Sequence, residues 1–173
     1  ASAESRKKGR INSAPATALK VAFDRLFPDG VIDRTDLTVI EDFGHHPTAL
    51  DLTLESLRAR YPQHRLVACF EPRSNTAARK VMQDAFREAL KKADEVFLAP
   101  PHRADKLGEE RFDSAGVATA ITAAGRKGYA PASNDALLTE LTALVKSDQS
   151  PRCVVFFSNG AFGGIIKKFA QAI

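Results

Sequence analysis

Three short, almost uninterrupted apolar runs, separated by segments with helical periodicity, constrain the fold of this chain most. The runs cover residues 66–70 (LVACF), 95–99 (EVFLA) and 152–159 (RCVVFFSN). Continuous apolar runs of this length are typical of strands that are covered on both faces. Strands that alternate with helices through short connections predict an α/β fold: a mostly parallel sheet with helices on both faces.

Apolar stripes mark the expected helices. The first helix should begin near Pro47, because proline is tolerated in the first turn of a helix. Its stripe consists of Leu50, Leu54, Leu57 and Tyr61. A second helix is marked by Met82, Phe86, Ala89, Leu90 and Ala93, and a third by Leu137, Leu138, Leu141, Leu144 and Val145. The pattern also predicts a weaker helix over 114–125, a short strand over 128–132 and a closing helix over 163–173.

The first part of the chain is less regular. Residues 1–17 are small, polar and charged without apolar periodicity, which predicts a disordered tail or an inter-domain linker. Residues 18–173 are expected to form one domain. Short runs at 19–27 and 37–43 are joined by turn residues, which predicts a hairpin or a pair of neighbouring strands that precedes the alternating part.

Composition and charge argue against several classes of function. The chain has 173 residues, of which 44% are hydrophobic and 27% charged, as in a globular domain. Residues 1–10 hold four of the 25 basic and one of the 21 acidic residues, so this short segment carries +3 of the net charge of +4. Binding to nucleic acid needs basic residues clustered on a structured surface. No nucleic-acid partner is therefore expected.

The sequence also argues against a membrane or secreted protein. No stretch approaches the roughly 20 consecutive apolar residues that a membrane helix needs, and no secretory signal opens the sequence. Cys69 and Cys153 both lie in apolar runs, which is typical of buried, reduced thiols. We expect a cytoplasmic protein that has no membrane partner.

Polar and glycine-bearing segments follow the predicted strands. Right-handed crossovers place the ends of all parallel strands at one edge of the sheet, here called the carboxyl edge, where ligands bind in open α/β sheets. The segments at this edge are 41–48 (EDFGHHPT), 71–76 (EPRSNT), 99–103 (APPHR) and 158–164 (SNGAFGG). The expectation is that they meet along one side of the molecule and shape a ligand site.

The segment 41–48 permits three interpretations. Helix N-termini favour anions, so His45 and His46 could bind a nucleotide or its phosphates. Asp42 and the two histidines could instead hold a metal ion, although adjacent histidines seldom point the same way and no distant further ligand stands out. A structural role, with Asp42 or Thr48 capping the helix, is the third.

The other segments offer groups for an anion. Arg73 presents a planar fork suited to a carboxylate or a phosphate. Ser74, Asn75 and Thr76 add hydrogen-bonding groups, or one of them caps the next helix. The glycines near the last strand let backbone N–H groups approach a ligand, or serve only to reverse the chain. Neither a P-loop nor a G-x-S-x-G elbow occurs in the sequence.

Three motifs together resemble the C-terminal domain of the Mur ligases over roughly residues 19–173. They are EDFGHHPTAL, FEPRSNT and FFSNGAFGGI, in this order and spacing. The resemblance implies a Rossmann-like domain whose partners are an N-terminal UDP-sugar domain and a central ATPase domain of the same chain. ATP and Mg²⁺ would be held mainly by that central domain. In the family, ATP phosphorylates the muramate carboxylate, and an amine then displaces phosphate.

Within the family, EPRSNT with SNG-x-FGG resembles the member that joins recycled L-alanyl-γ-D-glutamyl-meso-diaminopimelate to UDP-N-acetylmuramate. By position, the resemblance implies a role in closing over the nucleotide for Asp42, Phe43, His45 and His46. It implies peptide binding for Arg73, Ser74, Asn75, His102, Arg103, Asn159, Gly160 and Gly163. No catalytic residue and no metal ligand is expected within this domain, so the isolated domain should be inactive.

Some residues depart from the family pattern, and other functions stay open. Phe43 stands where several relatives have tyrosine, and Ala161 replaces an expected glycine. The alternatives are the member of the family that adds L-alanine, and a stand-alone nucleotide-binding or anion-binding module. A nucleic-acid binder that uses residues 1–10 is a further hypothesis.

Overall fold

The computed structural model describes residues 36–102 and 104–173, so the predictions for 1–17 and 19–27 lie outside the described residues. The strands are β1 (Leu37–Asp42), β2 (Arg65–Phe70), β3 (Glu95–Leu98), β4 (Lys127–Tyr129) and β5 (Arg152–Phe157). The helices are α2 (Pro47–Arg60), α3 (Gln83–Leu90), α4 (Ala104–Leu107), α5 (Ser114–Ala123), α6 (Asn134–Lys146) and α7 (Ile165–Ala172), with 3₁₀ turns η1 (Lys80–Met82), η2 (Gly108–Glu110) and η3 (Phe162–Gly164).

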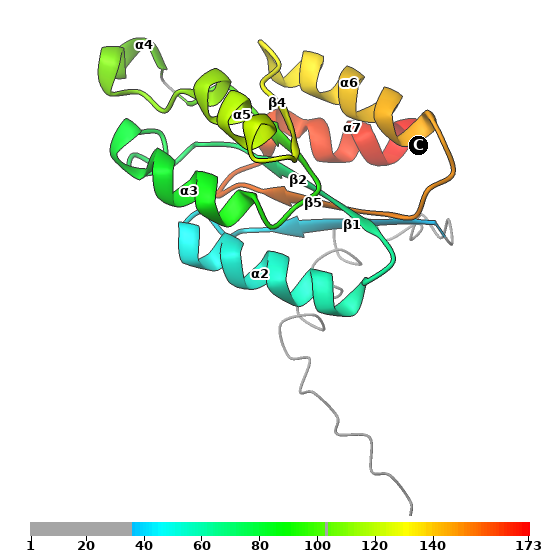
Figure 1. Cartoon of the computed structure of the whole chain (residues 1–173). Coiled ribbons are helices and arrows are strands. Elements are labelled where there is room, and N and C mark those ends of the chain that lie inside the picture. Colours follow the sequence, from blue (N-terminus) through cyan, green and yellow to red (C-terminus); the bar gives the residue numbers. More distant parts are fainter. Residues whose placement is uncertain (1–35, 103) are drawn as a thin grey trace, which may run out of the picture.

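The five strands form one sheet in the order β1-β5-β2-β3-β4 (Figure 1). All four strand pairs are parallel, so the predicted Rossmann-like α/β fold is confirmed. Arg152, the first residue of β5, is level with Leu37 in β1 and with Arg65 in β2. Because these three strands start level and have the same length, they also end level.

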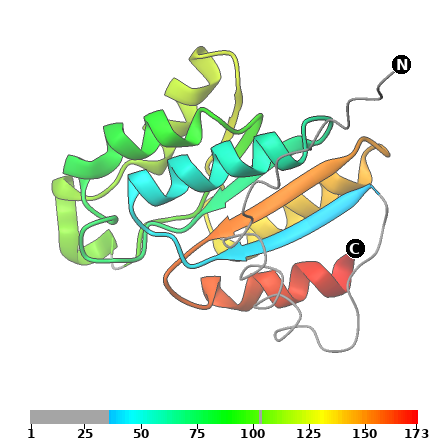
Figure 2. The ribbon, with the colours of Figure 1, turned by 90° about the horizontal axis from the view of Figure 1, so that it is seen from below.

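Two hydrophobic clusters cover the two faces of the sheet. One cluster joins the sheet to α2, α3 and α5, and the other joins it to α6 and α7. Figure 2 shows α2 and α3 on one side of β1 and β5, with α7 on the other. In the first cluster the ring of Phe70 stacks on Phe86 at 4.5 Å. In the second, Phe156 lies between the rings of Phe162 and Phe169.

The path of the chain creates a topological switch point at the carboxyl edge above β5. The segments that follow β1 and β2 lead to α2 and α3 on one face, whereas the segment that follows β5 leads to α7 on the other. Neighbouring strands whose connections leave toward opposite faces define a topological switch point, where α/β sheets bind ligands. This switch point, here called the crevice, lies between residues 71–76 and residues 158–164.

Helix boundaries differ from the expectations in two places. Met82 and Ala93 are buried or half-buried as predicted, but α3 is shorter and contains neither of them, because η1 precedes it. The N-cap of α2 is His46, and its side chain makes no capping hydrogen bond. The interpretation that Asp42 or Thr48 caps this helix is thus wrong, because Thr48 lies inside α2 and the oxygens of Asp42 accept bonds from Gly44 N and Thr53 Oγ1.

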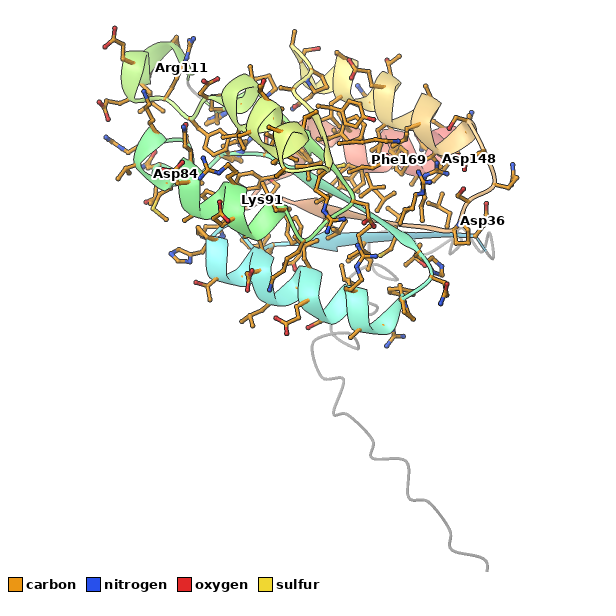
Figure 3. All side chains as sticks on the ribbon, viewed as in Figure 1. Asp36, Asp84, Lys91, Arg111, Asp148 and Phe169 are labelled. Atoms are coloured by element: carbon orange, nitrogen blue, oxygen red, sulfur yellow. The ribbon has the colours of Figure 1, made fainter. Side chains whose placement is uncertain are left out.

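The opposite edge of the sheet is held by a buried arginine. Arg152 is 2% exposed and donates two hydrogen bonds, of 2.9 and 3.1 Å, to the carboxylate of Asp148. These bonds, together with one from Ser150 N, hold the pKa of Asp148 far below its ordinary value of 3.8. Figure 3 labels Asp148 at this end of the molecule.

Asp148→Asn is expected to lower the melting temperature at neutral pH, because the buried guanidinium of Arg152 loses its carboxylate. A carboxyl group whose pKa is depressed by folding contributes stability that is present above its unfolded-state pKa of 3.8 and is lost as pH falls toward its folded-state pKa. The difference in melting temperature between wild type and variant should therefore be constant from pH 5 to 8 and become smaller below about pH 4. Melting curves at a series of pH values measure it, and a gap that widens in acid would contradict the assignment.

Candidate functional site

Backbone hydrogen bonds tie the four predicted segments together along the carboxyl edge. Ser158 N donates to Asp42 O at 3.2 Å, and Glu71 N donates to Phe157 O at 3.0 Å. Two further bonds of 3.0 Å run from Ala99 N to Phe70 O and from His102 N to Pro72 O. The four segments thus lie along one edge, as the sequence predicts, and they are linked in the spatial order of the strands β1, β5, β2 and β3.

A buried carboxylate lies at the centre of this edge. Glu71 is 5% exposed, and its Oε2 accepts a hydrogen bond of 2.5 Å from Ser158 Oγ. Ser158 Oγ in turn accepts a bond of 3.1 Å from Gly160 N. Glu71 Oε1 lies 3.5 Å from Nη1 of Arg73. One acidic side chain therefore fixes both the segment after β2 and the segment after β5.

Arg73 closes this arrangement by lying across Gly160. A Cβ atom placed on Gly160 would come within 2.7 Å of Arg73 Cδ and would also overlap Nε. The Arg73 side chain is 37% exposed, and its Nε and Cζ lie over the glycine together with Cδ. Glu71, Ser158, Gly160 and Arg73 form a ring of contacts, here called the Glu71 ring. A half-exposed arginine fork held in this way can bind a planar carboxylate.

The segment after β5 turns sharply before α7. Phe162, Gly163 and Gly164 all have positive φ, of 47°, 60° and 77°. Only glycine adopts this region readily, and Phe162 is held there by its buried ring against Phe156. A Cβ atom on Gly163 would lie 2.6 Å from Nδ2 of Asn134. Ala161 has φ −76°, which any residue adopts, so the missing glycine there costs no backbone geometry.

Asn159 carries a shielded hydrogen-bond acceptor. Its Oδ1 is buried and has no hydrogen-bond partner among the described residues. An acceptor left in this state costs roughly 1–3 kcal/mol. The segment after β5 would therefore gain from a donor that reached this atom.

The segment after β1 uses Asp42 internally. Asp42 Oδ1 accepts a bond of 2.7 Å from Gly44 N, and Oδ2 accepts one of 2.7 Å from Thr53 Oγ1. Phe43 is 68% exposed, and its ring lies edge-on to His45 at 6.3 Å. His45 Nδ1 is 3.0 Å from Phe43 O, and His45 and His46 are both exposed. This segment therefore offers the ring of Phe43 and two imidazoles, rather than the Asp42 carboxylate, to a ligand.

The remaining predicted residues lie along the segments after β2 and β3. Ser74 Oγ accepts a bond of 3.0 Å from Ala77 N and so caps a turn rather than α3, which begins nine residues later at Gln83. Asn75 is exposed and His102 is half-buried. Arg103 lies outside the described residues. The structure thus places the described side chains of the predicted set on the carboxyl edge without testing their roles.

Sequence reasoning missed Glu71 and Ser158, although both stand in the quoted motifs. The signal that could have found them is a polar residue placed directly after a fully buried strand, where it must find a partner. No group of three or more His, Cys, Asp or Glu side chains suited to a metal ion gathers among the residues that the structure describes. In the same part of the chain, no helix is long and apolar enough to cross a membrane.

The fold is that of a Rossmann-like α/β domain with a topological switch point at its carboxyl edge, and comparison with known proteins identifies its family. Residues 30–160 match the family described as Mur ligase, glutamate ligase domain. This match covers more than half of the chain, and the chain belongs to the Mur ligase family.

Two relatives differ in the reaction that their names state. The UDP-N-acetylmuramate–L-alanine ligase of Hydrogenovibrio crunogenus is 30% identical over 146 residues, which are 84% of this chain and 31% of that protein. The UDP-N-acetylmuramate–L-alanyl-γ-D-glutamyl-meso-2,6-diaminoheptandioate ligase of Escherichia coli is 33% identical over 138 residues, which are 79% of this chain and 28% of that protein. The chain thus spans about a third of the length of these curated relatives.

Two solved structures have a similar fold. The murein peptide ligase of Psychrobacter arcticus superposes with a TM-score of 0.64 at 28% identity, covering 82% of this chain and 28% of that one. A domain from Haemophilus ducreyi, described as part of a UDP-N-acetylmuramate:L-alanyl-γ-D-glutamyl-meso-diaminopimelate ligase, gives a TM-score of 0.57 at 26% identity. It covers 83% of this chain and 95% of that one.

Proposed function

We propose that this chain is the C-terminal domain of an ATP-dependent, ADP-forming amide ligase. The ligase joins recycled L-alanyl-γ-D-glutamyl-meso-diaminopimelate to UDP-N-acetylmuramate through an acyl phosphate. The chain receives the acceptor peptide and closes over the nucleotide, while other domains of the complete protein hold the UDP-sugar, the phosphates and Mg²⁺. A cytoplasmic location is part of this proposal, because ATP is the phosphoryl donor.

The observation that carries the proposal is the position of Arg73 in the crevice. The peptide acceptor carries carboxylates, and Arg73 offers a half-exposed fork beside the turn at Gly160. Glu71 lies beneath this fork, because its carboxylate is buried whereas the Arg73 side chain is 37% exposed. An acceptor bound here through a carboxylate would have its amine free to attack an acyl phosphate on the facing domain.

The segment after β1 supports the nucleotide part of the proposal. Phe43 is one of the few large apolar side chains that the described residues expose, and a base can stack on such a ring. The imidazoles of His45 and His46 lie at the start of α2, whose N-terminus favours an anion. Contact through a phenolic hydroxyl is excluded, since Phe43 has none.

The second candidate is the UDP-N-acetylmuramate–L-alanine ligase. The relative from Hydrogenovibrio crunogenus supports it, because that protein is similar over more of this chain than the one from Escherichia coli. Both acceptors carry a carboxylate, which Arg73 would bind in either case. They differ in the size of the acceptor that the crevice must accept.

A coupled assay of ADP release by the complete ligase separates the two candidates. With UDP-N-acetylmuramate and ATP present, the tripeptide should support ADP release and L-alanine should not. The chain of residues 1–173 alone should release no ADP with either acceptor, because it lacks a P-loop. Turnover with L-alanine alone would transfer the assignment to the second candidate, and turnover by the isolated chain would contradict both.

A further inference from the structure

Two arginines from distant parts of the sequence lie side by side beyond the carboxyl edge. Arg79 follows β2 and Arg111 follows β3, and an isolated antiparallel bridge pairs them. Both residues have extended backbones, with ψ of 146° and 149°. The bridge joins residues 74–82 to residues 104–113, which together are here called the edge lobe. Figure 3 shows Arg111 beside α4, at the end of the molecule away from Asp148.

The hydrogen bonding brings the two side chains close. Phe112 N donates a bond of 2.7 Å to Ala78 O, so the bond flanks the Arg79–Arg111 pair instead of joining it. This is the pattern of a non-hydrogen-bonded pair, in which the Cα atoms are about 4.5 Å apart and the side chains are closest. Paired residues project on the same side of a ribbon. The two arginine side chains therefore leave the backbone on the same side.

Both arginines lie at the surface beside buried neighbours. Ala78 and Phe112 are 2% and 1% exposed, and Phe112 packs against the rings of Phe70 and Phe86. Successive side chains on an extended segment point in opposite directions. Since Phe112 points into the core, Arg111 before it points to the surface, and Arg79 is exposed as well.

Among the described residues, no ion pair joins an acidic side chain to Arg79 or Arg111. Like charges directly opposite one another destabilise a strand pair. Glu109 and Glu110 precede Arg111 in η2, yet among the described residues no ion pair joins either of them to Arg79 or Arg111. Lys80 is also exposed and adds a third positive charge beside the pair. The backbone thus fixes an unfavourable arrangement of charge that an anion would relieve.

The pair lies within reach of a ligand bound at Arg73. One helical turn, closed by a bond of 2.9 Å from Ala78 N to Ser74 O, separates Arg73 from Arg79. At 3.8 Å for each link and about 6 Å for the turn, their Cα atoms are at most about 14 Å apart. A three-residue peptide spans about 10 Å, and the arginine side chains extend beyond their Cα atoms. One peptide with two carboxylates can therefore contact both places.

We propose that Arg79 and Arg111 form a second anion site, which binds a carboxylate of the acceptor peptide while Arg73 binds another. This inference rests on the proposed function, because it takes the acceptor to be a peptide with several carboxylates. L-Alanine has one carboxylate and would leave the second site without a ligand. The site would thereby favour the longer acceptor.

The test compares Arg79→Gln, Arg111→Gln and the double variant in the complete ligase. Each single change is expected to raise KM for the tripeptide about fivefold, the scale of an exposed charge pair, and the double variant to raise it further. The kcat and the KM for ATP and for UDP-N-acetylmuramate should stay unchanged. Arg126→Gln, which removes the same charge near the opposite edge beside Asp94, is the control and should leave KM for the tripeptide as it is.

Two further measurements separate binding from a structural role. The melting temperature of the single variants should not fall, because each removes a like-charge contact, whereas a structural role would lower it. The second measurement uses a set of tripeptides, each amidated at a different carboxylate. For one of these peptides, the KM of the double variant should equal that of wild type, because the amidated carboxylate is the one that the arginine pair binds.

Each outcome has one meaning. If wild type uses the tripeptide and the variants use it equally well, the second site is refuted and the proposed function stands. A rise in KM for UDP-N-acetylmuramate instead would assign the pair to the sugar nucleotide and refute an acceptor site. If wild type does not use the tripeptide at all, the proposed function fails, and this inference fails with it.

Discussion

Arg73→Ala is expected to lower kcat/KM for the acceptor peptide about 30-fold or more in the complete ligase. The guanidinium would otherwise form a charged hydrogen bond to the acceptor carboxylate, and the loss of such a bond costs about 2 kcal/mol. The KM for ATP should not change, because the fork faces the crevice between the segments after β2 and β5. Steady-state kinetics with the tripeptide as the varied substrate measure this effect.

Two variants serve as controls for Arg73. Arg73→Lys keeps the charge but not the planar fork, so it should recover only part of the loss. Arg126→Ala removes a half-exposed arginine that pairs with Asp94 near the opposite edge, and it should leave acceptor kinetics unchanged. Normal kinetics of Arg73→Ala would refute the role of Arg73 in acceptor binding.

Gly160→Ala is expected to reproduce most of the Arg73→Ala defect while the protein stays folded. The added methyl group would occupy the space of Arg73 Cδ and Nε. This side chain is flexible and half-exposed, and Glu71 keeps its hydrogen bond from Ser158 Oγ when Arg73 moves away, so the protein stays folded; Arg73 then leaves the position in which it binds the acceptor. We expect kcat/KM for the tripeptide to fall more than tenfold, with a melting temperature close to that of wild type.

A double-mutant cycle makes this prediction specific. If Gly160→Ala acts only by displacing Arg73, it should add no further loss in the Arg73→Ala background, so the two effects will not be additive. Ala161→Ser is the matched control, because Ala161 is exposed and has an ordinary φ of −76°. Full additivity would show that Gly160 acts on the reaction independently of Arg73.

The strands and helices could be predicted from local pattern, since burial on both faces leaves a continuous apolar run in the sequence. Residues 66–70 are all buried, and the first helix begins at Pro47 as expected. The position of β5 between β1 and β2 could not be predicted in this way. Strand order depends on which face each connecting helix covers, and this follows from packing across the whole sheet rather than from any one segment.

The candidate site, too, could be predicted from the sequence only in part. The motifs indicated that the segments around Arg73 and Gly160 meet, because ligand-binding loops gather where parallel strands end. They did not indicate that Arg73 lies on Gly160, or that Glu71 and Ser158 hold both from beneath. Arg79 and Arg111 are 32 positions apart, and only the three-dimensional bridge reveals that they are neighbours. Long-range contacts between surface residues leave no periodic signal in a sequence.

The bonds that link the four segments along the carboxyl edge run between main-chain atoms, from Ser158 to Asp42, from Glu71 to Phe157 and from His102 to Pro72. Side chains such as Asn75 or His102 can therefore be exchanged without dismantling the frame that carries them. During evolution, such a domain can change its specificity to a different amino acid or peptide through a few replacements, while its architecture is inherited intact.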